Sequence, residues 1–218
     1  MADHTYSLLG TTIGYSPADW AEPTRLPGWT RSHIAAHLIL GARGLLRVLQ
    51  GGPGTYLYDS SHARARDIEL GALCGGMELQ VELDTTAGEL QSVLPELNHA
   101  ALQPLFPGDS TRLCDIPLLR LRELVLHSFD LEPDAASDLV VAPDLAVSLL
   151  GSLPQPSVGL ANEPTIVARA DEGLEVVLPG IGDPMWVSGP ARCLVTWITR
   201  RVGSHALRFA DAPSSQDI

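Results

Sequence analysis

The sequence contains few basic residues and no basic cluster. Lys and Arg together number 14 of the 218 residues, whereas Asp and Glu number 26, which gives a formal net charge of -12 at pH 7. A surface with this excess of negative charge repels phosphate backbones. We therefore expect no nucleic acid among the partners of this protein.

Long apolar runs are also missing. No stretch approaches the roughly 18 apolar residues that a membrane-spanning helix needs. The opening residues MADHTYSLLG lack the basic start and the apolar run of a signal peptide. These absences predict a soluble, cytoplasmic protein with no membrane partner.

Cysteine is scarce. Cys74, Cys114 and Cys193 are odd in number and far apart, and none belongs to a CxxC pair. This pattern argues against a disulfide framework and against a zinc site made of thiolates. We expect three buried, reduced thiols.

The residues that are present favour a compact, largely helical first part. Hydrophobic residues make up 45% of the chain and charged residues 18%, a composition that supports a real core. Apolar spacing predicts five helices, of which glycines weaken the third. They lie near residues 5–20, 31–50, 61–97, 117–131 and 143–154.

The character of the sequence changes after residue 154. TIVARA and LEVVLPG, separated by a short Asp-Glu-Gly turn, predict a β-hairpin, MWVSGP predicts another strand, and ARCLVTWITRRVG has helical spacing. Together these patterns predict an α+β protein. Its expected parts are a helical bundle at residues 1–153, a small α+β domain at 160–210 and a tail at 211–218.

A narrow polar stripe runs along the otherwise apolar helix PLLRLRELVLHSFDL. Arg120, Glu123, His127 and Asp130 share this stripe because residues three or four apart lie on one face of a helix. The stripe either faces solvent or lines an internal cavity, and the pattern alone favours solvent.

Two histidines lie four residues apart in LPGWTRSHIAAHL, where the next candidate helix begins. His37 lies at the margin of the apolar stripe, whereas His33 lies farther toward the polar side, so His37 is the better placed to point inward. Two imidazole nitrogens and one carboxylate oxygen are a ligand set of catalytic Zn²⁺. His37, Glu123 and His127 would supply it, but core packing of these residues stays open because such spacings are common.

Three motifs together resemble the mycothiol-dependent maleylpyruvate isomerase family. They are LPGWTRSHIAAHL, YDSSHARARDIELGA and RELVLHSFDL, and VSGPARCLVTWITRR is similar to the family's C-terminal part. The resemblance implies a DinB-like four-helix bundle followed by a small, sterol-carrier-like α/β domain. It also implies that His37, Glu123 and His127 bind zinc or another divalent metal.

The resemblance implies an enzyme that uses mycothiol as a thiol cosubstrate. In the family the thiol adds to the cis double bond of maleylpyruvate, the adduct rotates, and elimination leaves fumarylpyruvate. Zn²⁺ would favour the thiolate. Arg201, with its neighbour Arg200, would contact an anionic substrate.

Several points stay open. Asp130 either holds a ligand histidine through its second ring nitrogen or is a surface aspartate. The sequence departs from the resemblance at Gly41, where asparagine is expected, and at Arg200, where glycine is expected. Extra glycines in ELGALCGGMEL predict space for a different electrophile.

These departures leave the reaction undecided between isomerisation and thiol S-transfer. A metal-assisted hydrolase is an alternative enzyme, and a small-molecule-binding protein with a structural metal is an alternative outside enzymes. Both a monomer and a homodimer fit the sequence.

Overall fold

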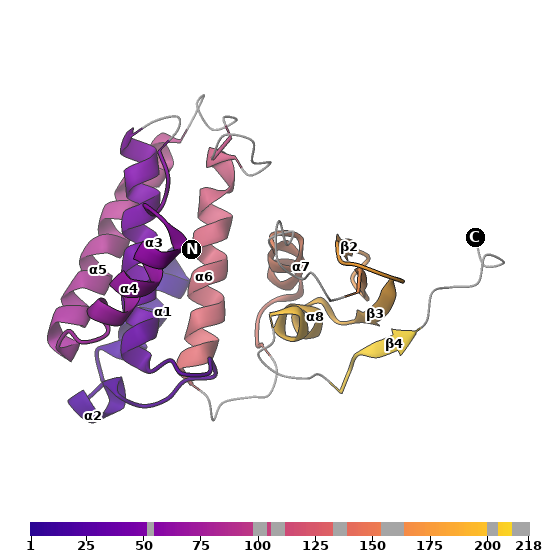
Figure 1. Cartoon of the computed structure of the whole chain (residues 1–218), viewed down its shortest axis with the longest axis horizontal. Helices are drawn as coiled ribbons and strands as arrows, with labels where there is room; N and C mark the ends of the chain where they lie inside the picture. The colour runs from indigo at the N-terminus through magenta and orange to yellow at the C-terminus, as the bar shows by residue number, and fades with distance from the viewer. Residues whose placement is uncertain are drawn as a thin grey trace. The chain divides into compact units, whose positions relative to one another are not determined.

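We describe the protein from a computed structural model, which describes residues 1–51, 55–97, 104–105, 112–132, 139–153, 164–199 and 205–210. The contacts divide the chain into two compact units, Met1–Pro133 and Asp134–Ile218. Figure 1 shows helices in the first unit and a mixture of helices and strands in the second.

The helices α1, α3, α5 and α6 form a four-helix bundle in the first unit. α3 contacts α4, α5 and α6, while α1 contacts α5 and α6, so the α3–α6 and α1–α5 pairs are opposite edges of one bundle. The helices are α1 (Ala2–Thr12), α2 (Pro17–Trp20), α3 (Arg31–Gly51), α4 (Ser61–Gly71), α5 (Gly76–Val93) and α6 (Ile116–Leu131), with short 3-10 turns at Leu94–Glu96 and Leu113–Asp115.

Two of the predicted helices are divided. The helix expected near residues 5–20 breaks because Ser16 begins a new one: its side chain accepts a hydrogen bond from the Asp19 amide, and Pro17 suits the first turn. The helix expected near 61–97 breaks into α4 and α5 at its glycines. The predictions for 31–50 and 117–131 are confirmed to within one residue at each end.

The bundle core consists of apolar side chains from all four long helices. One cluster gathers near the start of α3, and the second gathers farther along the same helix, against α5 and the beginning of α6. Members of the first cluster include Leu8, Trp20, Ile34, Leu38, Leu83, Leu124 and Leu131, and members of the second include Ala42, Leu46, Leu90 and Ile116.

The second unit is a four-stranded sheet with two helices. The strands have the order β2-β1-β3-β4, in which β1 is antiparallel to β2 and parallel to β3, and β3 is antiparallel to β4. α8 contacts β1, β3 and α7. The elements are α7 (Pro143–Gly151), β1 (Ile166–Ala170), β2 (Glu175–Leu178), β3 (Met185–Gly189), α8 (Ala191–Ile198) and β4 (Arg208–Ala210).

The α+β class and the bundle followed by a small mixed domain are confirmed. The predicted hairpin and the strand in MWVSGP are present, whereas β4 was not predicted. The contacts group α7 with the second unit, so this division differs from the expected boundary near residue 153. The expected tail at 211–218 lies outside the described residues.

The cysteines are free, as expected, but they do not share one environment. Cys193 is buried, Cys74 is partly buried and Cys114 is exposed. The prediction of burial is therefore wrong for Cys114, which lies in the short turn before α6. Within the described ranges, no helix is both long and apolar enough to cross a membrane.

Candidate metal centre

A tight turn sets the start of α3. Gly28 has a φ of 80°, which glycine adopts without strain, and the Trp29 amide donates to the Leu26 carbonyl across the turn at 3.0 Å. The Thr30 amide then donates to Nδ1 of His33 at 3.2 Å, so His33 helps to cap the helix. His37 lies one turn further along, where its side chain enters the core.

Hydrogen bonds join the segment between α2 and α3, together with the first residue of α3, to the end of α6. Nε of Arg25 donates to the Phe129 carbonyl at 3.1 Å, and Nε of Arg31 donates to the Leu131 carbonyl at the same distance. These bonds satisfy carbonyls that the helix end leaves without intrahelical partners. They also hold the start of α3 close to the last turns of α6, where His127 lies.

The structure brings His37, Glu123 and His127 together. Nε2 of His37 lies 2.8 Å from Oε2 of Glu123, and Nε2 of His127 lies 3.5 Å from the same oxygen. The three ligand atoms lie within 4.8 Å of one another. Both histidines are 7% exposed. Two rigid helices thus direct two imidazoles and one carboxylate at a common point.

Asp130 holds the outer side of His127. Its side chain has no exposed surface, and Oδ2 accepts the hydrogen of His127 Nδ1 at 2.9 Å. The bond leaves Nε2 as the nitrogen that faces Glu123, and a histidine oriented in this way can ligate a cation through Nε2 once that nitrogen is deprotonated. The alternative of a surface aspartate is therefore wrong.

The polar stripe of α6 faces inward. Arg120, His127 and Asp130 are buried, and Glu123 is partly buried. The expectation that the stripe faces solvent is wrong because α3 packs along this side of α6. A buried set of polar residues on an apolar helix is a functional-site candidate.

Burial and close partners shift the pKa values of the cluster. Desolvation would raise the pKa of Glu123, but hydrogen bonds from His127 and His37 hold it well below its usual value. Burial lowers the pKa of His37 below its usual value. Burial would also lower the pKa of His127, but bonds to Asp130 and Glu123 raise it. Glu123 is therefore an anion at neutral pH and attracts a cation.

Arg64 on α4 contacts the other side of His37. Its Nη2 lies 2.9 Å from His37 Nδ1, and because arginine only donates, Nδ1 accepts and the ring hydrogen of neutral His37 lies on Nε2. A cation held by Nε2 requires that hydrogen to move to Nδ1, so Arg64 would then turn away. With this one change the three residues fit a divalent cation.

Two further groups near the cluster were not assigned a function from the sequence. Arg64 lies inside the SHARARDIEL motif, but its spacing gives no sign that it reaches α3. Tyr58 precedes α4, and the guanidinium carbon of Arg64 lies 5.3 Å from the centre of its ring.

Trp29 packs beside His37, with ring centres 5.6 Å apart. Arg200 and Arg201 lie outside the described residues.

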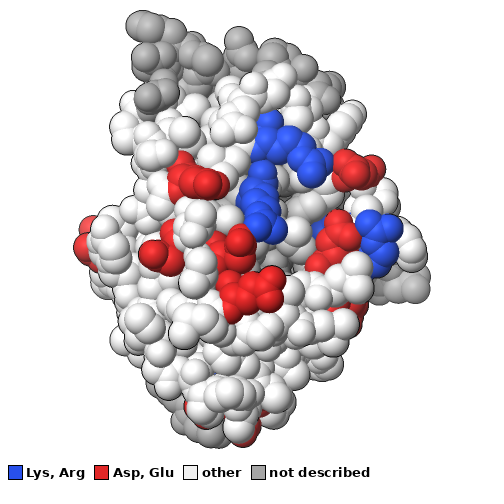
Figure 2. Space-filling view, turned by 90° about the vertical axis from the view of Figure 1, so that its left-hand side faces the viewer, with Lys and Arg blue, Asp and Glu red and all other residues white. Residues whose placement is uncertain are grey.

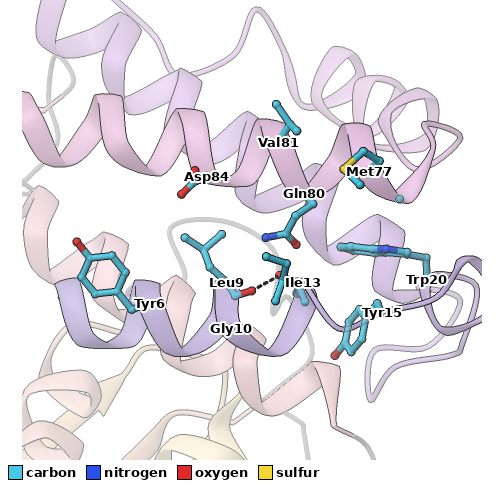
Figure 3. A pocket seen from close by; sticks show the side chains of 12 residues that line it. Tyr6, Leu9, Gly10, Ile13, Tyr15, Trp20, Met77, Gln80, Val81 and Asp84 are labelled. Carbon is cyan, nitrogen blue, oxygen red and sulfur yellow. Dashed lines mark hydrogen bonds between the residues drawn. The ribbon is translucent and has the colours of Figure 1, made fainter.

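A separate hollow lies between α1 and α5, on the opposite edge of the bundle from the α3–α6 pair. Figure 3 shows mostly apolar side chains around it, such as Leu9, Ile13 and Val81, and its volume is about 510 Å³. None of the three candidate ligands lines it. This hollow and the polar cluster are therefore different places on the bundle.

Two of the three extra glycines around α4 and α5 do not open space for a substrate, whereas nothing lies within 4 Å of a Cβ atom added at Gly75. A Cβ atom at Gly71 would lie 2.9 Å from Cβ of Ala36, and one at Gly76 would lie 2.3 Å from Cδ1 of Trp20. Both glycines allow close packing. The expectation that they widen the site is therefore wrong at these two positions.

A helical bundle with a buried His-Glu-His cluster between two of its helices defines a DinB-like protein. Residues 7–132 match the mycothiol maleylpyruvate isomerase N-terminal domain family. The chain therefore belongs to this family. No curated protein matches it in sequence.

Two solved structures share the fold. The crystal structure of the mycothiol-dependent maleylpyruvate isomerase aligns with a TM-score of 0.78 at 21% identity, over 97% of this chain and 91% of that chain. A histidine-to-alanine mutant of that isomerase also aligns with a TM-score of 0.78, at 20% identity and the same coverage. The likeness extends over both units and establishes the fold.

Proposed function

We propose that this protein is a zinc-dependent enzyme that uses mycothiol to attack an electrophilic, anionic substrate. The observation that carries the proposal is the buried cluster of His37, Glu123 and His127 in a chain of the mycothiol maleylpyruvate isomerase family. These three side chains would hold the cation. When bound, the cation supplies positive charge that favours the thiolate form of a thiol at neutral pH.

The reaction we favour is cis–trans isomerisation of the maleylpyruvate type. The thiolate sulfur bonds to one alkene carbon, and the electron pair of the double bond moves to the carbon beside the carbonyl. Rotation about the resulting single bond and expulsion of the thiolate leave the trans isomer, so the thiol is regenerated. If the adduct instead takes up a proton and stays intact, the same chemistry is S-transfer.

The residues of the chain have separate tasks in this proposal. Asp130 orients His127 through its 2.9 Å hydrogen bond, and Trp29 restricts the ring of His37 by packing beside it. Both histidines are buried, whereas Glu123 is partly exposed, so a ligand would reach the cluster from the side of Glu123. We assign Arg201, with Arg200, to one carboxylate of the substrate, as the family resemblance implies.

Metal analysis with a matched pair of histidine variants tests the proposal. His37→Ala removes a proposed ligand, while His33→Ala lies one turn earlier on α3 and contacts Thr30 and Glu69 instead of the cluster. We expect about one zinc per chain by mass spectrometry in wild type and His33→Ala, and none in His37→Ala. Mycothiol-dependent loss of maleylpyruvate should follow the same order.

Product analysis by NMR separates the two reactions. Fumarylpyruvate with unchanged mycothiol indicates isomerisation, whereas a thioether formed at the expense of mycothiol indicates S-transfer. Full metal content and activity in His37→Ala would contradict the ligand assignment. Metal binding without any thiol-dependent reaction would favour a binding protein.

A further inference from the structure

Arg120 carries a buried positive charge that the described residues do not neutralise by an ion pair. Its side chain is 4% exposed, and Nη1 donates to the Leu38 carbonyl at 3.0 Å. A guanidinium has five N–H donors, and this carbonyl is the acceptor that the described parts of the chain give it. Glu123, three residues further along α6, attracts this charge from a distance, but its oxygens contact the two histidines and Arg122. Burying a charge without a partner is costly, so a ligand that pairs with it would be favoured.

Gly41 faces this guanidinium without a side chain of its own. A Cβ atom at Gly41 would lie 3.8 Å from Nη1 of Arg120 and 3.9 Å from the Tyr58 hydroxyl, which are ordinary contact distances. Two polar groups therefore approach one point of α3 that has no side chain. The family resemblance places asparagine at this position, and that longer side chain would occupy the space.

Arg64 adds a second guanidinium to the same place. It lies over the ring of Tyr58 and touches His37, and no carboxylate in the described ranges forms an ion pair with it. Other arginines of the bundle differ, because Arg43 pairs with Glu82 and Arg66 pairs with Asp67. Positive charge that is left unpaired beside a candidate metal centre attracts an anion.

We propose that Arg120, Tyr58 and Arg64 form an anion-binding subsite beside the candidate metal centre, and that it holds a carboxylate of the substrate. Gly41 places no side chain of its own between these groups and the carboxylate. The subsite rests on the proposed function for its role in catalysis, because it positions the electrophile next to the thiol. Guanidinium groups suit it since they bind carboxylates in a bidentate manner.

The subsite also sets substrate specificity. A substrate without a carboxylate would leave the buried charge of Arg120 unpaired. A site with unpaired buried polar groups discriminates strongly against such a substrate. An electrophile with an anionic group at a fixed distance from its double bond is therefore the expected class.

Calorimetric titration with succinate, a dicarboxylate without a reactive double bond, tests the subsite. Succinamide serves as its uncharged counterpart, and both zinc-loaded and chelator-treated protein are titrated. We expect succinate but not succinamide to bind wild type. Arg120→Gln should weaken succinate binding at least 10-fold in both forms, and Arg64→Gln should weaken it in the zinc-loaded form. Arg66→Gln, a matched change on the same helix, should leave it unchanged.

Two substitutions of Gly41 test the subsite even if Arg120→Gln does not fold. An added Cβ in Gly41→Ala makes ordinary contacts with Arg120 and Tyr58, and the longer side chain of Gly41→Leu would press against both groups. We expect Gly41→Ala to bind succinate, and Gly41→Leu to lose at least 10-fold in affinity with an unchanged circular dichroism spectrum.

Equal succinate affinity in wild type, Arg120→Gln and Gly41→Leu would overturn the subsite, as would equal affinity for succinate and succinamide. Failure of the proposed function gives a different result. If zinc does not bind or no thiol-dependent reaction occurs, the titration of chelator-treated protein still decides whether the subsite exists.

Discussion

Asp130 is the residue whose position says most about the chemistry of the cluster. It is fully buried, and its carboxylate accepts a hydrogen bond from the ring of His127. A carboxylate behind a ligand histidine fixes the tautomer and raises the basicity of the nitrogen that faces the cation. In the proposed metal centre Asp130 would therefore act through His127 as a positioning residue.

Asp130→Asn should weaken zinc binding about 10- to 100-fold, because removal of a partner that orients a ligand typically has this effect. The asparagine keeps the size of the side chain but not its charge. Competition with a chelating dye measures the affinity. Asp67→Asn, an exposed change on α4, is the control and should have no effect. Unchanged zinc affinity in Asp130→Asn would contradict the positioning role.

The same variant has a defined pH dependence in metal-free protein. The pKa of His127 is raised above 6.5 in the folded state, so its proton stabilises the fold below the unfolded pKa, and this contribution is lost as pH rises through the folded pKa. Asp130→Asn removes one cause of the shift. The loss of unfolding free energy should be larger at pH 5.5 than at pH 8.5, as measured by urea denaturation. An equal loss at both pH values would count against this linkage.

At the scale of the element, α5 begins where the chain passes a core tryptophan. Gly76 is the first residue of α5, and a Cβ there would lie 2.4 Å from Nε1 of Trp20, whose side chain is 4% exposed. Trp20 belongs to the first core cluster, so it cannot move without disturbing its neighbours. The glycine is therefore needed for packing between α2 and α5.

Gly76→Ala should lower the free energy of unfolding by about 1–3 kcal/mol, the usual cost of overpacking. Gly88→Ala is the matched control on the same helix, because nothing lies within 4 Å of the added Cβ. That change should raise stability by about 0.5–1 kcal/mol, since alanine favours the helix interior. Urea denaturation measures both. If the two variants had the same stability, the close approach to Trp20 would not be limiting.

The elements with strong local signals were predictable, and those without were not. α3 was predictable because Gly51 and the following glycine and proline stop its apolar stripe, and α6 because prolines lie at both ends. The break at Ser16 depends on a single cap, and β4 is a short edge strand held by pairing with β3. Local patterns do not contain such long-range pairings.

The residues of the candidate site were also predictable only in part. Spacing on α3 and α6 made His37, Glu123 and His127 candidates, because a helix places such residues on one face, but it left core packing open, and the ligand assignment came from the family resemblance. The inward direction of Arg120 was not predictable, since it depends on which neighbouring helix covers that face. Arg64 was missed for the same reason: it reaches His37 from a third helix.

At the scale of the whole molecule, a net charge of -12 coexists with a local group of arginines. Figure 2 shows a small group of basic side chains near the centre of the face that it presents, with acidic side chains around it. Arg64, Arg120 and Arg122 lie around the His37–Glu123 pair. An anionic ligand would therefore meet attraction mainly at short range, where burial weakens screening by salt.

Because the chain forms two compact units, metal binding should stabilise the first unit and not the second. His37 and the other two candidate ligands lie on α3 and α6 of the first unit, so a cation that binds them stabilises the contacts between these helices. At a free concentration 100 times the Kd, such binding adds about 2.7 kcal/mol to the folded state. The strands β1 to β3 contain none of the three residues.

Hydrogen exchange with and without zinc measures this stabilisation. We expect zinc to slow amide exchange at least 10-fold in peptides from α3 and α6, because opening them requires release of the cation, and to leave peptides from β1 and β3 unchanged. His37→Ala should exchange at the zinc-free rate under both conditions. Equal slowing in the second unit would show instead that the two units open together. A zinc effect that persists in His37→Ala would place the cation elsewhere in the chain.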